Sequence, residues 1–207
     1  MRKVHVVGPQ TSYSRWIKNF ELTDNIEEAD IVMFTGGCDI NPEIYGCKKH
    51  SSTYYDARRD AFELEAFKKI RPDQFCVGTC RGAQLFCALY GGRLIQDVSN
   101  HSSYGTHKII SLKNSSESYE ITTIHHQMMY PFNMPKEHYS VLYATPNLSA
   151  YYHGDQIDMP PYDPEVILFH KKGMPTCLGI QGHPEMMRAD APVLDMLNKI
   201  LDKYVSK

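Results

Sequence analysis

Residues 75–92 read FCVGTCRGAQLFCALYGG, an apolar strand, a glycine-flanked cysteine and an apolar helix in immediate succession. The run 75–77 predicts a short buried strand, and 81–90 predicts a helix that the glycine pair 91–92 ends as a C-terminal cap. Cys80 lies in the turn between the two. A strand that passes directly into a helix is typical of α/β proteins, so this stretch indicates both a fold class and a reactive group.

Gly78 and Gly82 stand two residues on either side of Cys80, which gives the cysteine form of the G-x-S-x-G nucleophile turn. The glycines let the strand and the helix approach closely, and the helix N-terminus favours the thiolate. The backbone N–H of Arg81 would point to a developing oxyanion. A buried structural cysteine in a β–α turn is the alternative, and these five residues alone do not separate the two.

The same alternation of strands and helices continues along the chain. Apolar runs and periodicity predict strands at 3–7, 31–34, 75–77, 166–169 and 177–181, and helices at 56–70, 81–90 and 191–204. This order predicts an α/β fold with a mostly parallel central sheet flanked by helices, in a single domain over residues 1–207. The middle, 108–144, is richer in strand patterns. Residues 159–164, MPPYDP, should form an irregular loop, since three prolines in six positions exclude a helix and a sheet interior.

Composition narrows the class of protein. The 207 residues carry 22 Lys and Arg against 24 Asp and Glu, a net charge of −2, which argues against a nucleic-acid binder held by phosphate contacts. No apolar run approaches the ~20 residues of a membrane span, and the first strand stops too early for a signal peptide. We therefore expect a cytoplasmic protein that does not bind membranes. In that compartment the six cysteines should be free thiols: Cys38, Cys47, Cys76, Cys80, Cys87 and Cys177.

A nucleophilic thiol needs a base, and His183 is placed to supply it. It follows the apolar strand 177–180 in the sequence QGHPE, and the ends of strands are where active-site groups gather in open α/β sheets. Glu185 lies two residues further on, where its carboxylate could hold the Nδ1 hydrogen of His183 and direct Nε2 to the thiol. Taken alone, the segment is also compatible with a loop that merely caps a strand, which is the more frequent case for such a segment.

The two segments together resemble the class I glutamine amidotransferase superfamily, which is marked by a G-x-C-x-G-x-Q turn and a late H-P-E. Here these are GTCRGAQ at 78–84 and HPE at 183–185. Four further segments are similar to the γ-glutamyl-γ-aminobutyrate hydrolase group, the C26 cysteine peptidases: GGCDINPEIYG at 36–46, DARRDAFE at 56–63, GGRLIQD at 91–97 and HHQ at 125–127. The chain departs from that group at 121–123, where ITT replaces V-N-S, and it lacks a recognisable D-G-x-x-E-A segment.

The resemblance implies a flavodoxin-like fold and a cysteine hydrolase that cleaves the γ-glutamyl amide bond of glutamine or of a γ-glutamyl amine. It implies a γ-glutamyl thioester on the nucleophile, a small-molecule substrate and no cofactor. The implied catalytic residues are Cys80, His183 and Glu185, the implied oxyanion donors are the N–H groups of Gly37 and Arg81, and the implied substrate-binding residues are Gln84, His125, His126 and Gln127.

Two other functions stay open. The chain could be a glutaminase subunit that delivers ammonia to a separate synthase partner, or a non-catalytic binding or regulatory relative, against which the complete Cys80–His183–Glu185 set argues. The sequence also leaves open whether the chain forms a homodimer.

Several charged residues near these motifs have less specific roles. The Arg81 side chain could bind a substrate carboxylate or cover the helix N-terminus. Asp39, Arg59 and Asp60 are expected in turns and ion pairs rather than in catalysis.

A metal site is the remaining question, raised by His101, His107, His125 and His126. Neighbouring histidines in a strand point to opposite faces, and the sequence offers no carboxylate or cysteine that completes a ligand set. We therefore expect no metal site.

Overall fold

A computed structural model describes residues 1–205, without the side chain of Tyr104. Nine strands form its main sheet: β1 (Arg2–Val7), β2 (Phe20–Leu22), β3 (Ile31–Phe34), β4 (Phe75–Thr79), β7 (Ser102–Ser111), β8 (Ser118–Ile124), β10 (Tyr139–Thr145), β12 (Asp163–Phe169) and β13 (Thr176–Ile180). Their order across the sheet is β2-β1-β3-β4-β13-β12-β10-β7-β8. Two small ribbons join β5 (Arg93–Ile95) to β9 (Met128–Tyr130) and β6 (Asp97–Val98) to β11 (Tyr152–His153).

The sheet has a parallel part and an antiparallel part. Strands β2, β1, β3, β4 and β13 are parallel to one another, whereas β12, β10, β7 and β8 extend the sheet in antiparallel fashion, beginning with the antiparallel pair β13–β12. The parallel strands are short and apolar, and β3 is buried throughout. This agrees with the expected α/β fold, because a parallel sheet needs cover on both faces.

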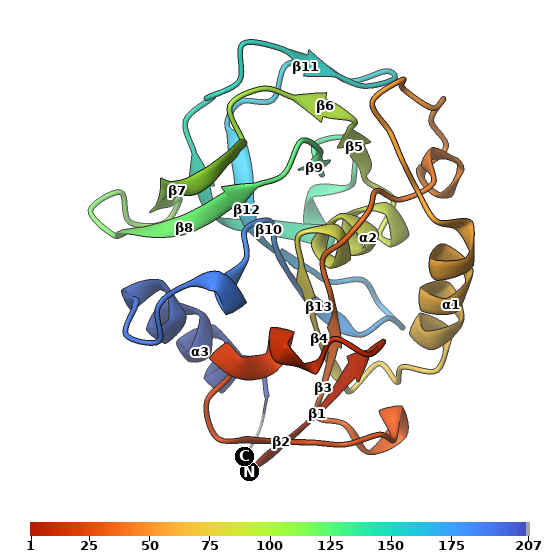
Figure 1. The fold of residues 1–207 in the computed structure, drawn as a ribbon, viewed down its shortest axis with the longest axis vertical. Helices are drawn as coiled ribbons and strands as arrows, with labels where there is room; N and C mark the ends of the chain where they lie inside the picture. The colour runs from red at the N-terminus through yellow and green to blue at the C-terminus, as the bar shows by residue number, and fades with distance from the viewer. Residues whose placement is uncertain (206–207) are drawn as a thin grey trace.

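Helices supply that cover (Figure 1). Helices α1 (Ala57–Lys68) and α2 (Arg81–Leu89) lie on one side of the parallel strands, and α3 (Pro192–Tyr204) packs on the other. Alternate residues of β3 divide between the two cores: Ile31 and Met33 belong to the α3 side, Val32 and Phe34 to the α2 side. Five short 3-10 helices complete the described elements: η1 (Thr11–Trp16), η2 (Ile26–Glu28), η3 (Pro42–Tyr45), η4 (Lys136–His138) and η5 (Pro184–Met186).

The prediction of an irregular loop over 159–164 was wrong for its last two residues, although 159–162 lie outside any helix or strand. Strand β12 begins at Asp163 and contains Pro164, which pairs with Ala144 of β10. On the other side, the pairing of β12 with β13 starts only at Val166. A proline is tolerated in this position because the missing N–H falls at the start of the strand, before it is flanked on both sides.

The carboxyl ends of β3, β4 and β13 meet at one edge of the sheet. The segments that follow them carry Gly37, Cys80 and His183 respectively. The topology therefore gathers the three predicted segments in one place. Within residues 1–205, none of the helices has the length and apolarity to cross a membrane.

Candidate active site

Cys80 occupies a strained turn between β4 and α2. Its backbone has φ +50° and ψ −104°, a conformation that residues with a side chain rarely adopt. The turn is held on both sides, because the Cys80 N–H donates to the Ile180 carbonyl (2.7 Å) and the Cys80 carbonyl accepts from the Gln84 N–H (3.0 Å). Such strain persists only where the surrounding structure enforces it, as at functional sites.

The flanking glycines are required by the close approach of β4, α2 and β3. A Cβ atom on Gly78 would lie 2.5 Å from the carbonyl carbon of Gly82, and one on Gly82 would lie 2.4 Å from the Phe34 carbonyl oxygen. Both contacts are with backbone atoms, which cannot move aside. A side chain at either position would therefore push the strand and the helix apart, which is the reason expected for glycine here.

His183 and Glu185 lie beside the thiol. The Nδ1 atom of His183 is 2.7 Å from Glu185 Oε1, and the Cys80 side chain is near enough to affect the pKa of the ring. Burial lowers the pKa of His183, but the interactions with Cys80 and Glu185 outweigh it and raise the pKa to about 10. The three side chains therefore form a chain in which the imidazole can hold a proton between thiolate and carboxylate.

We expect the ring of His183 to stay protonated up to a pH near 10. An NMR titration of the histidine Cε1 protons would show one ring with this high midpoint, assigned by its loss in His183→Gln. The midpoint should fall in Cys80→Ala, because that change removes an interaction that raises the pKa. A wild-type midpoint near the ordinary value of about 6.5 would contradict the arrangement. Since the folded pKa is raised, this proton stabilises the fold below pH about 6.5 and the contribution is lost as the pH rises toward 10.

The backbone after β3 is fixed by Arg59 of helix α1. Its Nη2 atom donates to the carbonyl oxygens of Gly36 (2.7 Å) and Thr35 (3.2 Å) and to Thr35 Oγ1 (3.0 Å). In a trans peptide the N–H points opposite to the carbonyl, so the Gly37 N–H is directed away from Arg59. Arg59 is held in turn by Glu63 (2.9 Å). Arg59 is an ion-pair residue, as expected, and it also sets the direction of the Gly37 N–H.

Arg81 contributes its backbone and its side chain to different parts of the molecule. Its N–H is in the first turn of α2, where helix N–H groups have no partner within the helix. The side chain is fully buried and forms ion pairs with Asp60 (2.5 Å) and Glu63 of α1. The expectation that this side chain binds a substrate carboxylate or covers the helix end was wrong, because two buried carboxylates already take its charge. Burial raises the pKa of Asp60 despite this pairing.

A cavity of about 200 Å³ opens next to the thiol. It is lined by Gly37, Cys38, Asp39, Tyr54, Cys80, Gln84, Ile124, His125, His126 and Gln127. All four residues that the resemblance assigns to substrate binding therefore border it, together with Cys80 and Gly37, the expected nucleophile and oxyanion donor. Asp39 and His126 form an ion pair in its wall, with Oδ1 and Nε2 3.0 Å apart, and this hydrogen bond raises the pKa of His126.

The other predicted substrate residues are tied into the wall. Gln84 Nε2 donates to the Gln127 carbonyl oxygen (3.0 Å), which lies 2.9 Å from His125 Nδ1 as well. Gln127 Nε2 donates to Thr53 Oγ1 (3.1 Å). The ring of His125 is buried, and its Nε2 atom faces Glu165 at 4.0 Å. Burial and the neighbouring His101 hold the pKa of His125 well below its usual value.

Two residues near the reactive groups were missed by sequence reasoning. The ring of Tyr13 in η1 lies 6.2 Å from that of His183. Burial, with Glu185 and Cys80 adding to it, raises the pKa of Tyr13 to about 12, so the hydroxyl keeps its proton at neutral pH. Tyr54 borders the cavity but is mostly exposed. Neither residue belongs to a motif, so the sequence offered no signal for either.

A cysteine in a strained turn, a histidine–glutamate pair beside it and this sheet are typical of the cysteine-type amidotransferases and hydrolases. The Peptidase C26 family model matches residues 17–141, and the chain belongs to that family.

Similar proteins agree with this assignment. The chain is 34% identical over 132 residues to the glutamine amidotransferase-like protein YvdE homolog of Lactococcus lactis subsp. cremoris. This match covers 53% of this chain and 70% of the relative. YvdE of L. lactis subsp. lactis is 32% identical over 132 residues, and this match covers 53% of the chain and 56% of that relative. A glutamine amidotransferase structure from Thermotoga maritima has the same fold, with a TM-score of 0.52, 15% identity and coverage of 98% of this chain and 84% of that one.

Proposed function

We propose that the chain hydrolyses the γ-glutamyl amide bond of glutamine or of a γ-glutamyl amine through a thioester on Cys80. The observation that carries this proposal is the thiol in a strained turn at a helix N-terminus, beside a histidine that Glu185 orients and whose pKa the thiol helps to raise. In this proposal Cys80, His183 and Glu185 are the catalytic residues.

The reaction has two steps. The Cys80 sulfur attacks the γ-carbonyl carbon, and the oxyanion that forms accepts hydrogen bonds from the N–H groups of Gly37 and Arg81. The C–N bond then breaks and His183 transfers its proton to the departing amine, which leaves a γ-glutamyl thioester. Water attacks the thioester, His183 accepts a proton from the water, and glutamate leaves as the sulfur regains its negative charge.

The wall of the cavity supports an amino-acid substrate. A γ-glutamyl group presents an α-ammonium and an α-carboxylate side by side. The Asp39 carboxylate could bind the α-ammonium and the His126 imidazole could bind the α-carboxylate. These two side chains are neighbours, 3.0 Å apart, in the wall of the cavity that Cys80 also lines. A volume of about 200 Å³ suits a glutamyl group and leaves little room for a large amine inside the cavity.

We expect Arg59→Gln to lower kcat by roughly 10- to 100-fold with a smaller change in KM, because a misdirected oxyanion donor weakens the transition state more than the ground state. Steady-state kinetics on glutamine would measure this. The neighbouring Arg58→Gln is the matched control, since Arg58 is exposed on the same helix turn. Equal kcat values in the two variants would remove Arg59 from any part in positioning Gly37.

The proposed function is tested by a hydrolysis screen over glutamine, γ-glutamyl-γ-aminobutyrate and γ-glutamyl polyamines. At least one should be cleaved, and mass spectrometry of the quenched enzyme should find a γ-glutamyl adduct on the peptide that contains Cys80. Cys80→Ala is the control and should show neither. Cleavage that persists in this variant would refute the assignment.

A second function is a glutaminase subunit that delivers ammonia to a separate synthase partner. The similarity to proteins named as glutamine amidotransferase-like favours it. Glutamine hydrolysis that appears only when a synthase is added would support this second function over a stand-alone hydrolase. Activity of the purified chain alone would favour the hydrolase.

A further inference from the structure

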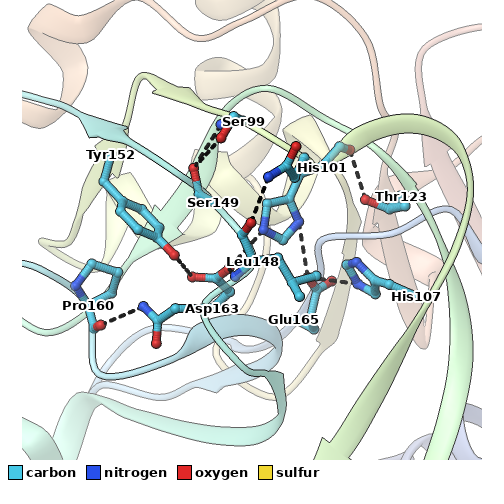
Figure 2. Close-up of polar contacts among 12 residues, drawn as sticks. Ser99, His101, His107, Thr123, Leu148, Ser149, Tyr152, Pro160, Asp163 and Glu165 are labelled. Atoms are coloured by element: carbon cyan, nitrogen blue, oxygen red, sulfur yellow. Dashed lines mark hydrogen bonds and ion pairs between the residues drawn. The ribbon is translucent and has the colours of Figure 1, made fainter.

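A cluster of histidines and carboxylates is buried behind the wall of the cavity, apart from Cys80, His183 and Glu185. Figure 2 shows four of its members, His101, His107, Asp163 and Glu165. His101 precedes β7, His107 lies in β7, His125 follows β8, and Asp163 and Glu165 lie in β12. Both carboxylates and His101 have no solvent exposure. The expectation that no carboxylate completes a ligand set with these histidines was wrong, because the sheet brings Glu165 to them.

The distances from Glu165 to His101 and to His125 suit ligands of one ion better than hydrogen bonds. Glu165 Oε1 lies 3.9 Å from His101 Nδ1 and 4.0 Å from His125 Nε2, and these three atoms lie within 4.8 Å of one another. Hydrogen bonds between nitrogen and oxygen require about 2.7–3.2 Å. At zinc–ligand bonds of about 2.0–2.2 Å, two ligands of one ion lie roughly 3–4 Å apart.

Most of these atoms lack other partners. Among the described residues, no hydrogen bond is made by His101 Nδ1, by His125 Nε2 or by Glu165 Oε2, and Glu165 Oε1 has an ion-pair contact with His107 Nε2 (3.0 Å). A fully buried carboxylate with an unsatisfied oxygen is costly, so such groups usually pair with a cation or a metal. Asp163 places a second carboxylate in the same interior, which also favours a bound cation.

The opposite ring nitrogens of His101 and His125 are already held by acceptors. His101 Nε2 lies 2.8 Å from Asp163 Oδ2, and His125 Nδ1 lies 2.9 Å from the Gln127 carbonyl oxygen. An acceptor at one ring nitrogen fixes the proton there and leaves a lone pair on the other, which here faces Glu165. Metal-binding histidines almost always have such an outer partner, a carboxylate or a backbone carbonyl. Asp163 is itself fixed by the Tyr152 hydroxyl (2.9 Å) and the Leu148 N–H (3.0 Å).

We propose that His101 Nδ1, His125 Nε2 and Glu165 bind a zinc ion, with His107 completing the site. His107 Nε2 lies 3.0 Å from Glu165 Oε1, near enough to supply a fourth ligand. Three imidazoles and one carboxylate suit a divalent ion of the zinc type, and a closed four-ligand set is typical of a structural site. The ion would join β7, the β8–β9 connection and β12 behind the cavity wall that His125 and Gln127 form. This proposal does not depend on the proposed reaction.

The test is metal analysis of the full chain, purified without a histidine tag, loaded with Zn²⁺ and dialysed. We expect one zinc ion per chain in the wild type and in Cys80→Ala, whose nucleophile cannot bind the metal. X-ray absorption should show nitrogen and oxygen ligands only. Zinc in less than stoichiometric amounts, or sulfur among its ligands, would overturn the proposal.

Variants locate the ion. Glu165→Gln should lose bound zinc and the rise in melting temperature that zinc gives the wild type. Asp163→Asn keeps every ligand but disturbs the proton on His101, so it should weaken zinc binding by about 10- to 100-fold. His153→Gln is the control, because His153 is exposed and stacks on another histidine, His50, outside the cluster. If Asp163→Asn binds zinc as tightly as the wild type, or if His153→Gln abolishes binding, the site is not the one proposed. The measurement on Asp163→Asn tests the site even if Glu165→Gln fails to fold.

Discussion

Replacing Cys80 with alanine should lower γ-glutamyl hydrolysis by about 10⁴- to 10⁶-fold, the loss typical when the nucleophile of a catalytic set is removed. The reason is that the proposed reaction runs through a covalent bond to this sulfur. Of the six cysteines, Cys80 is the one at the turn before α2, and Cys76, Cys87 and Cys177 are buried in the core.

The same position offers a second measurement, on stability. Alanine at φ +50° and ψ −104° keeps the strain of the turn, whereas glycine adopts positive φ freely. Strain of this kind costs about 1–3 kcal/mol, and glycine relieves it but loses part of the gain because its unfolded chain has more entropy. The free energy of unfolding of Cys80→Gly should therefore be about 1 kcal/mol higher than that of Cys80→Ala. Urea unfolding of the two inactive variants would measure the difference. A glycine variant no more stable than the alanine variant would mean that the turn stores no strain.

The part of the fold that local sequence controls could be predicted well. The segment 75–92 forms β4, Cys80 and α2 as expected, because an apolar run, a helix stripe and flanking glycines are all local signals. The short strands β2, β5, β6 and β11 were not predicted. They have only two or three residues each, which is too short for a periodicity, and their pairing partners lie far away in the chain.

The residues of the candidate site also fall into those that local motifs identify and those whose partners lie far away in the chain. Cys80, Gln84 and the pair His183–Glu185 are close in sequence to the elements that position them, so motifs identified them. The partners of Arg81 and of His125 come from other elements. Glu165 lies 40 residues after His125, in a strand whose start seemed excluded by prolines, and only the sheet register shows that the two meet.

The ion pairs around the buried Arg81 side chain could not be predicted, because they depend on how many positive and negative side chains meet between α1 and α2. Four charged side chains meet between α1 and α2: Arg59, Asp60, Glu63 and Arg81. Two are positive and two negative, so the cluster is neutral overall. The sequence shows the four residues but not that Arg81 turns away from the substrate side to complete this set.

Arg81→Met should therefore destabilise the protein by about 3–5 kcal/mol, the cost of leaving a buried charge without its partner. Chemical denaturation at neutral pH would measure the loss. The exposed Arg71→Met is the control: it removes an ion pair with Asp73 (3.1 Å) on the surface, where such pairs contribute little, and should leave the free energy of unfolding nearly unchanged.

The pH dependence and a second variant separate charge imbalance from lost packing. Burial already raises the pKa of Asp60, and losing Arg81 should raise it further, so folded Asp60 binds a proton at a pH where the unfolded chain does not. The destabilisation by Arg81→Met should accordingly shrink as the pH falls through that raised pKa. Adding Glu63→Gln leaves Arg59 and Asp60 as one positive and one negative charge, and should recover part of the lost stability at neutral pH. If the loss of stability is the same at every pH and Glu63→Gln only adds to it, the charge-balance explanation is wrong. The Arg81 side chain would then stabilise the interior by packing, and not by balancing the carboxylates between α1 and α2.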